Sequence, residues 1–132
     1  MKYLLDTNIC IAIINRRSPK AIKRLQNCEP GSVALSTISV AELRFGADKS
    51  QATTKNHYAL DQFLLSLEIA EFDELSAIAY GVIRADLESK GTPIGPLDTL
   101  IAAQAVAHGL TLITNNKNEF DRVQKLKVEN WI

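Results

Sequence analysis

The chain has 132 residues, of which 15 are Lys or Arg and 15 are Asp or Glu, so its formal net charge is zero. This length suits one domain over residues 1–132 that needs neither a disulfide nor a metal to fold, and the zero net charge argues against a protein that wraps nucleic acid by charge alone. No apolar run reaches the roughly 20 residues that span a bilayer, and Cys10 and Cys28 have no CxxC spacing, so we expect a soluble cytoplasmic protein with reduced thiols and no membrane contact.

The first half of the chain alternates predicted strands and helices. The apolar run Tyr3-Leu4-Leu5 is typical of a buried strand, and it stops at the carboxylate of Asp6. Ser39-Val40-Ala41-Glu42 matches the S-x-x-E capping box, which predicts that a helix begins at Ser39. The other elements expected here are a buried helix over 8–15, a helix that begins at Ser18-Pro19, a strand over 32–38, a polar loop over 48–55 and a helix over 56–67.

The second half continues the alternation. Asp73 is predicted to cap a long helix that ends at Gly91, and Pro96 to open a helix with Asp98 in its first turn. We expect the inward face of the first of these helices to consist of Leu75, Ile78, Ala79, Val82 and Leu87. The remaining predicted elements are a strand over 69–72, an irregular stretch over 91–96, a strand over 110–113, a turn over 114–116 and an edge strand over 128–132. Together these patterns predict an α/β fold, with a central, mostly parallel, twisted sheet of four to five strands and helices on both faces.

Four acidic residues lie near predicted strand ends or open a helix: Asp6, Glu42, Asp98 and Glu119. Because the carboxyl ends of parallel strands share one edge of a sheet, a crevice there could collect these side chains. Each acid also has a local explanation. Asp6 could cap a helix, Glu42 could complete the capping box, Asp98 is favoured by the helix dipole, and Glu119 could be a solvated loop charge.

A cluster of such acids favours a divalent cation. Two carboxylates about 5 Å apart repel by roughly 3 kcal/mol at an effective dielectric constant near 20. Mg²⁺ prefers oxygen ligands, keeps much of its water and is held by one or two carboxylates together with substrate phosphate. The reaction class that fits this inventory is metal-assisted hydrolysis of a phosphodiester.

Four short motifs also follow one another in order: Leu5-Asp6-Thr7-Asn8, then Ser39-Val40-Ala41-Glu42-Leu43 with Gly46, then Gly95-Pro96-Leu97-Asp98-Thr99-Leu100-Ile101-Ala102, and finally Thr114-Asn115-Asn116 through Glu119-Phe120. In order and spacing over the whole chain they resemble the motifs of the PIN-domain ribonucleases, specifically the VapC toxins of bacterial type II toxin–antitoxin pairs.

The resemblance implies roles for individual residues. It makes Asp6, Glu42 and Asp98 the core acids of a Mg²⁺ site in which Mn²⁺ can substitute. Glu119 would be a supporting catalytic ligand, although many relatives have aspartate there and some PIN domains place an acid where this chain has Asn116. Thr7 and Asn116 would orient the acids.

The resemblance also implies an activity and partners. The expected function is that of an endoribonuclease toxin that cleaves RNA, with tRNA as the target, and so inhibits translation. A homodimer is expected, together with a cognate VapB-type antitoxin whose C-terminal segment covers the active site.

The sequence does not match two other classes of α/β aspartate protein. A dehalogenase-like phosphatase needs an aspartate at the position of Asn8, and a receiver domain needs paired acids after the first strand, so neither pattern is met. A catalytically silent PIN-fold module that binds RNA or protein stays open as the alternative.

The sequence also allows predictions for a run of basic residues, for Arg84 and for the two histidines. The run of cations formed by Arg16, Arg17, Lys20, Lys23 and Arg24 is either a solvated helix face or a path for nucleic acid. Arg84 is expected to form an exposed ion pair, and His57 and His108 have no spacing typical of a metal site or a catalytic triad.

Overall fold

The computed structural model describes residues 1–132, and its centre is one parallel sheet of five strands. The order of the strands is β3-β2-β1-β4-β5, and all four pairings are parallel. Their bounds are β1 (Tyr3–Leu5), β2 (Val33–Ser36), β3 (Glu68–Ala70), β4 (Thr111–Ile113) and β5 (Lys127–Glu129). The predicted α/β fold is confirmed, with the sheet at the upper end of the predicted strand count.

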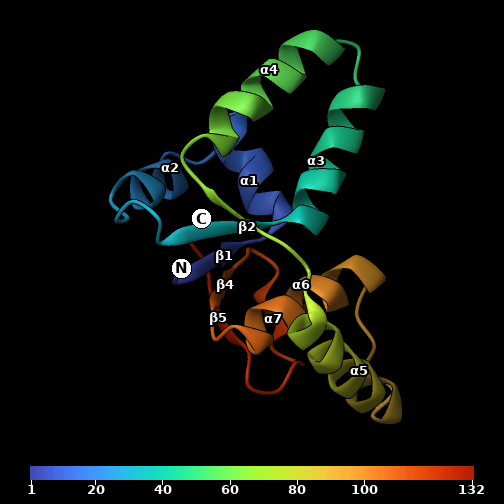
Figure 1. The fold of residues 1–132 in the computed structure, drawn as a ribbon. Helices are drawn as coiled ribbons and strands as arrows, with labels where there is room; N and C mark the ends of the chain where they lie inside the picture. The colour runs from blue at the N-terminus through green and yellow to red at the C-terminus, as the bar shows by residue number, and fades with distance from the viewer.

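Seven helices cover the two faces of this sheet (Figure 1). The helices of the first half of the chain lie on one face, and those of the second half lie on the other. The first group is α1 (Thr7–Ile14), α2 (Pro19–Gln26), α3 (Thr37–Lys49) and α4 (Thr53–Leu64). The second group is α5 (Glu74–Ser89), α6 (Pro96–Ala107) and α7 (Lys117–Phe120).

The alternation of side chains along each strand divides the core into two layers. Leu4 and Leu112 pack into the layer beneath α5 and α6, whereas Leu5 and Ile113 pack into the layer that contains Trp131 and residues of α1. All five of these residues are fully buried. Because both faces of the central strands β1, β2 and β4 are covered, these strands read as short apolar runs, whereas the edge strands β3 and β5 carry charged residues.

The strand order places a topological switch point at the carboxyl end of β1. The chain leaves β1 toward β2 and β3 on one side, and β4 then joins β1 on the other side. Such a switch point leaves room for polar groups at the ends of the two neighbouring strands. Asp6 directly follows β1 and Thr114 directly follows β4, and the N–H of Asp6 donates to the carbonyl of Ile113 at 2.8 Å.

Three predicted helix starts are confirmed. The Ser18 hydroxyl accepts from the N–H of Ala21 at 3.2 Å, and the Asp73 carboxylate accepts from the N–H of Ser76 at 2.9 Å. Pro96 is the first residue of α6. Other bounds were wrong by a few residues, chiefly at the predicted polar loop over 48–55, where α3 continues to Lys49 and α4 begins at Thr53.

The capping box predicted at Ser39 and Glu42 is wrong. The strand β2 ends at Ser36, whose hydroxyl caps α3 by accepting from the N–H of Ile38 at 3.0 Å. Ser39 is therefore inside the helix, where its buried hydroxyl has no hydrogen-bond partner. Glu42 does not bond to the start of the helix but turns toward α1, so its local explanation is removed.

The inward face predicted for α5 is also wrong in part. Leu87 is buried, but Leu75, Ile78 and Val82 are 58%, 61% and 69% exposed. The helix packs on α6 through a neighbouring stripe that includes Ile83 and Leu87, which leaves a second apolar stripe uncovered.

Both cysteines are free thiols, and none of the helices has the length and hydropathy needed to cross a bilayer.

Candidate active site

Asp6 is the most buried of the four predicted acids, with 4% of its surface exposed. One of its carboxylate oxygens accepts from the N–H of Thr7 at 2.8 Å, and the other accepts from the Thr114 hydroxyl at 2.8 Å. Burial raises the pKa of Asp6, the two hydrogen bonds oppose the rise, and the charges of Glu42 and Glu119 add to it. Asp6 thus caps α1, as one interpretation of the sequence predicted, and it also interacts with the charges of Glu42 and Glu119.

Glu42 faces Asp6 across the start of α1. It projects from the second turn of α3, and its carboxylate accepts from the Thr7 hydroxyl at 2.8 Å. The backbone N–H of the same threonine bonds to Asp6. Thr7 therefore connects the first two acids, as expected for a residue that orients them.

Asp98 lies in the first turn of α6 and is half-buried. Burial, followed by the charges of Asp6, Glu119 and Glu42, raises its pKa from 3.8 to about 6. The chain is close to this carboxylate at Gly95, where an added Cβ would lie 3.4 Å from one of the Asp98 oxygens. The surroundings of Asp98 thus penalise its charged form, and a cation in the crevice would relieve that penalty.

Glu119 lies on α7, a one-turn helix that the sequence analysis did not predict. The Asn116 side-chain amide donates to one of its carboxylate oxygens, and the N–H of Gly95 donates to the other at 3.3 Å. Glu119 therefore joins the segment after β4 to the loop before α6, in addition to its charge interaction with Asp6 and Asp98.

Thr114 is a site residue whose role the sequence analysis missed. Its fully buried hydroxyl donates to Asp6 and accepts from the N–H of Asn116 at 3.0 Å. The signal in the sequence is a hydroxyl directly after the apolar run Leu110–Ile113, where the sequence analysis predicts a turn and the fourth motif but gives Thr114 no role of its own. Only the pairing of β4 with β1 shows what it contacts.

All four predicted acids therefore belong to one electrostatic cluster at the carboxyl edge of the sheet. Their side chains are not gathered around one point, because no three acidic, histidine or cysteine groups lie close enough to ligate one ion together. Glu42 and Glu119 instead bond to Thr7, Asn116 and Gly95. The chemistry of this all-oxygen donor set suits Mg²⁺, which is held by one or two carboxylates and keeps several waters.

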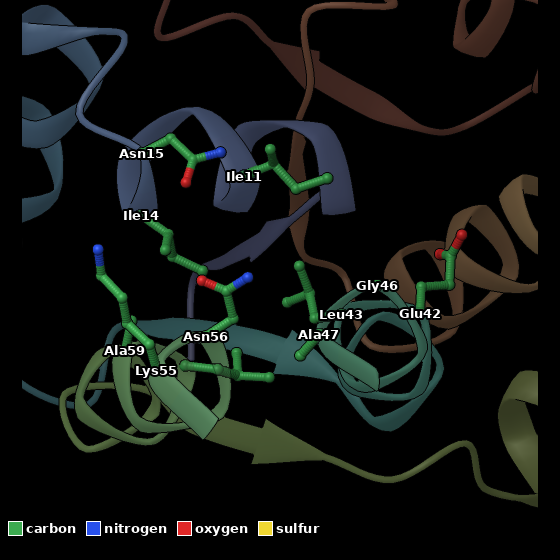
Figure 2. A pocket seen from close by; sticks show the side chains of 11 residues that line it. Ile11, Ile14, Asn15, Glu42, Leu43, Gly46, Ala47, Lys55, Asn56 and Ala59 are labelled. Atoms are coloured by element: carbon green, nitrogen blue, oxygen red, sulfur yellow. The ribbon is translucent and has the colours of Figure 1, made fainter. Parts of the chain in front are cut away.

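A groove leads away from the acid cluster between α1, α3 and α4 (Figure 2). Its volume is about 430 Å³, and Glu42 lies at one end while Asn15 and Lys55 lie toward the other. The apolar lining consists of Ile11, Ile14, Leu43, Ala47, Ala59 and Leu60. The site is thus continuous with an elongated, half-apolar surface.

The other residues singled out from the sequence have local partners. Arg84 forms the predicted exposed ion pair, and each histidine is paired with an aspartate. The contacts are Arg84 to Glu88 at 3.0 Å, His57 to Asp48 at 2.7 Å and His108 to Asp73 at 2.8 Å.

The fold and site define an α/β domain with an acid cluster at the switch point of a parallel sheet. A sequence profile for the family described as PIN domain matches residues 3–126. The chain is 40% identical over 131 residues to a tRNA(fMet)-specific endonuclease VapC of Salmonella typhimurium, with 99% of this chain and 98% of the relative covered. It is 42% identical over 132 residues to a Ribonuclease VapC2 of Rickettsia felis, with 99% of this chain and 98% of the relative covered. The chain therefore belongs to the PIN domain family, and within it to the group of the VapC ribonucleases.

Solved structures give the same result. A DNA-bound VapBC from Salmonella typhimurium contains a chain with a TM-score of 0.95 and 39% identity, covering 100% of this chain and 99% of that one. VapBC2 from Rickettsia felis, bound to a DNA fragment from the promoter, contains one with a TM-score of 0.91 and 40% identity, covering 100% of both.

Proposed function

We propose that this chain is a metal-dependent endoribonuclease that hydrolyses phosphodiester bonds in RNA, and that it is the toxin of a toxin–antitoxin pair. The observation that carries the proposal is the cluster of Asp6, Glu42, Asp98 and Glu119 at the carboxyl edge of the sheet, where burial first, and then the charges of the neighbouring acids, raise the pKa values of Asp6 and Asp98. Buried carboxylates held near other acids, as Asp6 and Asp98 are, are costly to a fold unless they serve a cation or a reaction. The ribonuclease names of the full-length relatives supply the reaction.

The roles of the residues follow from their contacts. Asp6 and Asp98 would hold Mg²⁺, or Mn²⁺ in its place, because neither carboxylate has an ionic partner in the protein. Glu42 would join the ligands once it leaves the Thr7 hydroxyl, and Glu119, which Asn116 and Gly95 hold away from α1, would act through water. When bound, the cation would lower the pKa of a water and offset charge on the scissile phosphate.

The remaining residues orient these acids. Thr114 fixes the carboxylate plane of Asp6 from the side of the sheet, and Thr7 fixes it from α1. Asn116 holds Glu119 toward the loop before α6. The single domain would thus present the acids to an RNA strand at an open crevice, in the cytoplasm where that substrate is found.

Cleavage of a tRNA pool by the antitoxin-free protein in Mg²⁺ or Mn²⁺ tests this proposal, and a relative described as specific for tRNA(fMet) makes tRNA the first substrate to try. We expect discrete fragments that are absent with a chelator and with Asp98→Asn. A folded protein that binds RNA tightly and cuts no RNA with any divalent ion would instead favour the silent binding module.

We also infer a protein partner of the antitoxin type, because the similar solved structures are VapBC complexes. The groove between α1, α3 and α4 suits a segment of that partner, since its apolar lining ends at Glu42. A segment bound there would cover the acids and stop cleavage. Ala59→Lys, at a partly exposed position of the groove lining, should weaken the complex while the variant still cleaves RNA.

A homodimer is inferred from the exposed stripe on α5. Leu75, Ile78 and Val82 recur at helical spacing and remain exposed in the single chain. A second copy of the same helix would cover this stripe in a self-complementary contact. Light scattering should give twice the chain mass for the natural protein and the chain mass for Ile78→Asp, and a monomeric natural protein would refute the inference.

A further inference from the structure

The segment that follows Asp6 in the chain, through α1 and α2, contains basic residues but no acidic ones. Between Asp6 and Glu29 there is no Asp or Glu. The five cations there, which we call the basic segment, are all exposed: Arg16, Arg17, Lys20, Lys23 and Arg24. Only Arg24 has a carboxylate partner, Glu129, and the other four form no ion pair.

Arg16 adopts a backbone conformation that favours glycine. Its φ is 54°, and it follows α1 at the position where helices commonly end on a glycine. The N–H groups of Arg16 and Arg17 donate to the carbonyls of Ile13 and Ala12 at 3.1 and 2.9 Å, as in the usual glycine-ended helix. A side chain costs conformational free energy at this position, and glycine would avoid that cost.

The position of the basic segment relative to the acids follows from α1. Asp6 caps the start of this helix, and its eight residues rise about 12 Å before the basic segment begins. This distance equals roughly four nucleotide steps of a stacked strand at about 3.4 Å each. Figure 2 shows the groove extending in the same direction, from Glu42 to Asn15.

We infer that the basic segment binds the phosphate backbone of the RNA substrate, several nucleotides away from the bond that is cut. This inference rests on the proposed function. A crevice with four carboxylates repels a polyanion, and a net charge of zero gives the chain no overall attraction for RNA. Local cations without acidic partners supply that attraction, and they suit phosphates better than a folded protein surface, where exposed charges alternate in sign.

The test compares two double variants that remove the same charge. Arg16→Gly with Arg17→Gln alters the basic segment, and Lys125→Gly with Lys127→Gln, at the start of β5 and outside the basic segment, is the matched control. Lys125 is the other non-glycine residue with a positive φ, at 67°, so both variants relieve the same kind of backbone strain. Neither variant should melt at a lower temperature than the natural protein.

Binding is measured by fluorescence anisotropy in an Asp98→Asn background, which prevents cleavage, with a whole tRNA and with a three-nucleotide RNA. We expect the variant of the basic segment to raise the Kd for tRNA about tenfold near 0.1 M salt, and to reduce the salt slope of log Kd by about 1.5 for two lost phosphate contacts. The control should bind tRNA as the background does. The three-nucleotide RNA, too short to reach the basic segment, should bind all proteins alike.

Equal binding of tRNA by both variants, or equal weakening in both, would overturn the inference. Unchanged RNA binding with loss of an acidic partner protein would overturn it too and assign the basic segment to that protein. The inference and the proposed function can fail separately: salt-dependent tRNA binding through these residues without any cleavage by the natural protein would refute only the ribonuclease.

Discussion

Asp98→Asn should stabilise the metal-free protein while it abolishes cleavage. The pKa of Asp98 rises from 3.8 to about 6 in the folded chain because of burial first and the charges of Asp6, Glu119 and Glu42 next. A rise of this size corresponds to about 3 kcal/mol in favour of the protonated form, at about 1.4 kcal/mol per pKa unit. Solvent screening of a half-buried group reduces it to about 1–2 kcal/mol.

The pH dependence has a definite sign. Because the folded-state pKa of Asp98 lies above the unfolded value, protonation stabilises the fold, and this contribution is fully present below about pH 3.8. It is lost as the pH rises toward and through about 6. Asparagine keeps the neutral form at every pH, although it gives up a favourable interaction of about 0.3–1 kcal/mol with the dipole of α6. The net gain should be about 1 kcal/mol at pH 7.5.

Urea denaturation with a chelator at pH 7.5 and pH 4 measures this gain. We expect Asp98→Asn to exceed the natural protein in free energy of unfolding at pH 7.5, with a melting temperature about 3 °C higher, and to lose the advantage at pH 4. Glu74→Gln removes a first-turn acid of α5 outside the acid cluster and is the matched control, which should not gain stability at pH 7.5. An Asp98→Asn protein no more stable than the natural one at pH 7.5 would refute the electrostatic reasoning.

Three further predictions concern the same site. Thr114→Val should cost about 1–3 kcal/mol in the free energy of unfolding, because a buried oxygen of Asp6 loses its donor, whereas Thr114→Ser should cost less; urea denaturation of both decides this. Ser36→Ala should cost about 1 kcal/mol by removing the cap of α3, and Ser39→Ala should cost nothing because its buried hydroxyl is unpaired; thermal melts that rank them the other way would restore the capping box. Mg²⁺ should raise the melting temperature more at pH 7.5 than at pH 5.5, because its ligands must be ionised, and an equal shift at both would count against an acid site.

The sequence by itself determined the elements and the candidate acids. Short apolar runs that stop at Asp6 and Thr114 mark buried parallel strands, and side-chain chemistry alone places Ser18, Asp73 and Pro96 at helix starts. These signals are local, because a cap or a strand end depends on neighbours within a few residues. The acids near those strand ends then predict a shared edge, as the charge interactions among them bear out.

Only the tertiary structure decided what each acid contacts. Ser36 and Ser39 are both competent caps three residues apart, and the choice between them depends on where β2 leaves the sheet. That choice frees Glu42 to meet Thr7, which lies 35 residues earlier in the chain. The uncovered stripe of α5 has the same origin. Periodicity shows that a helix has an apolar face. When that face is wider than one neighbouring helix can cover, the sequence spacing does not specify which part of it will be buried.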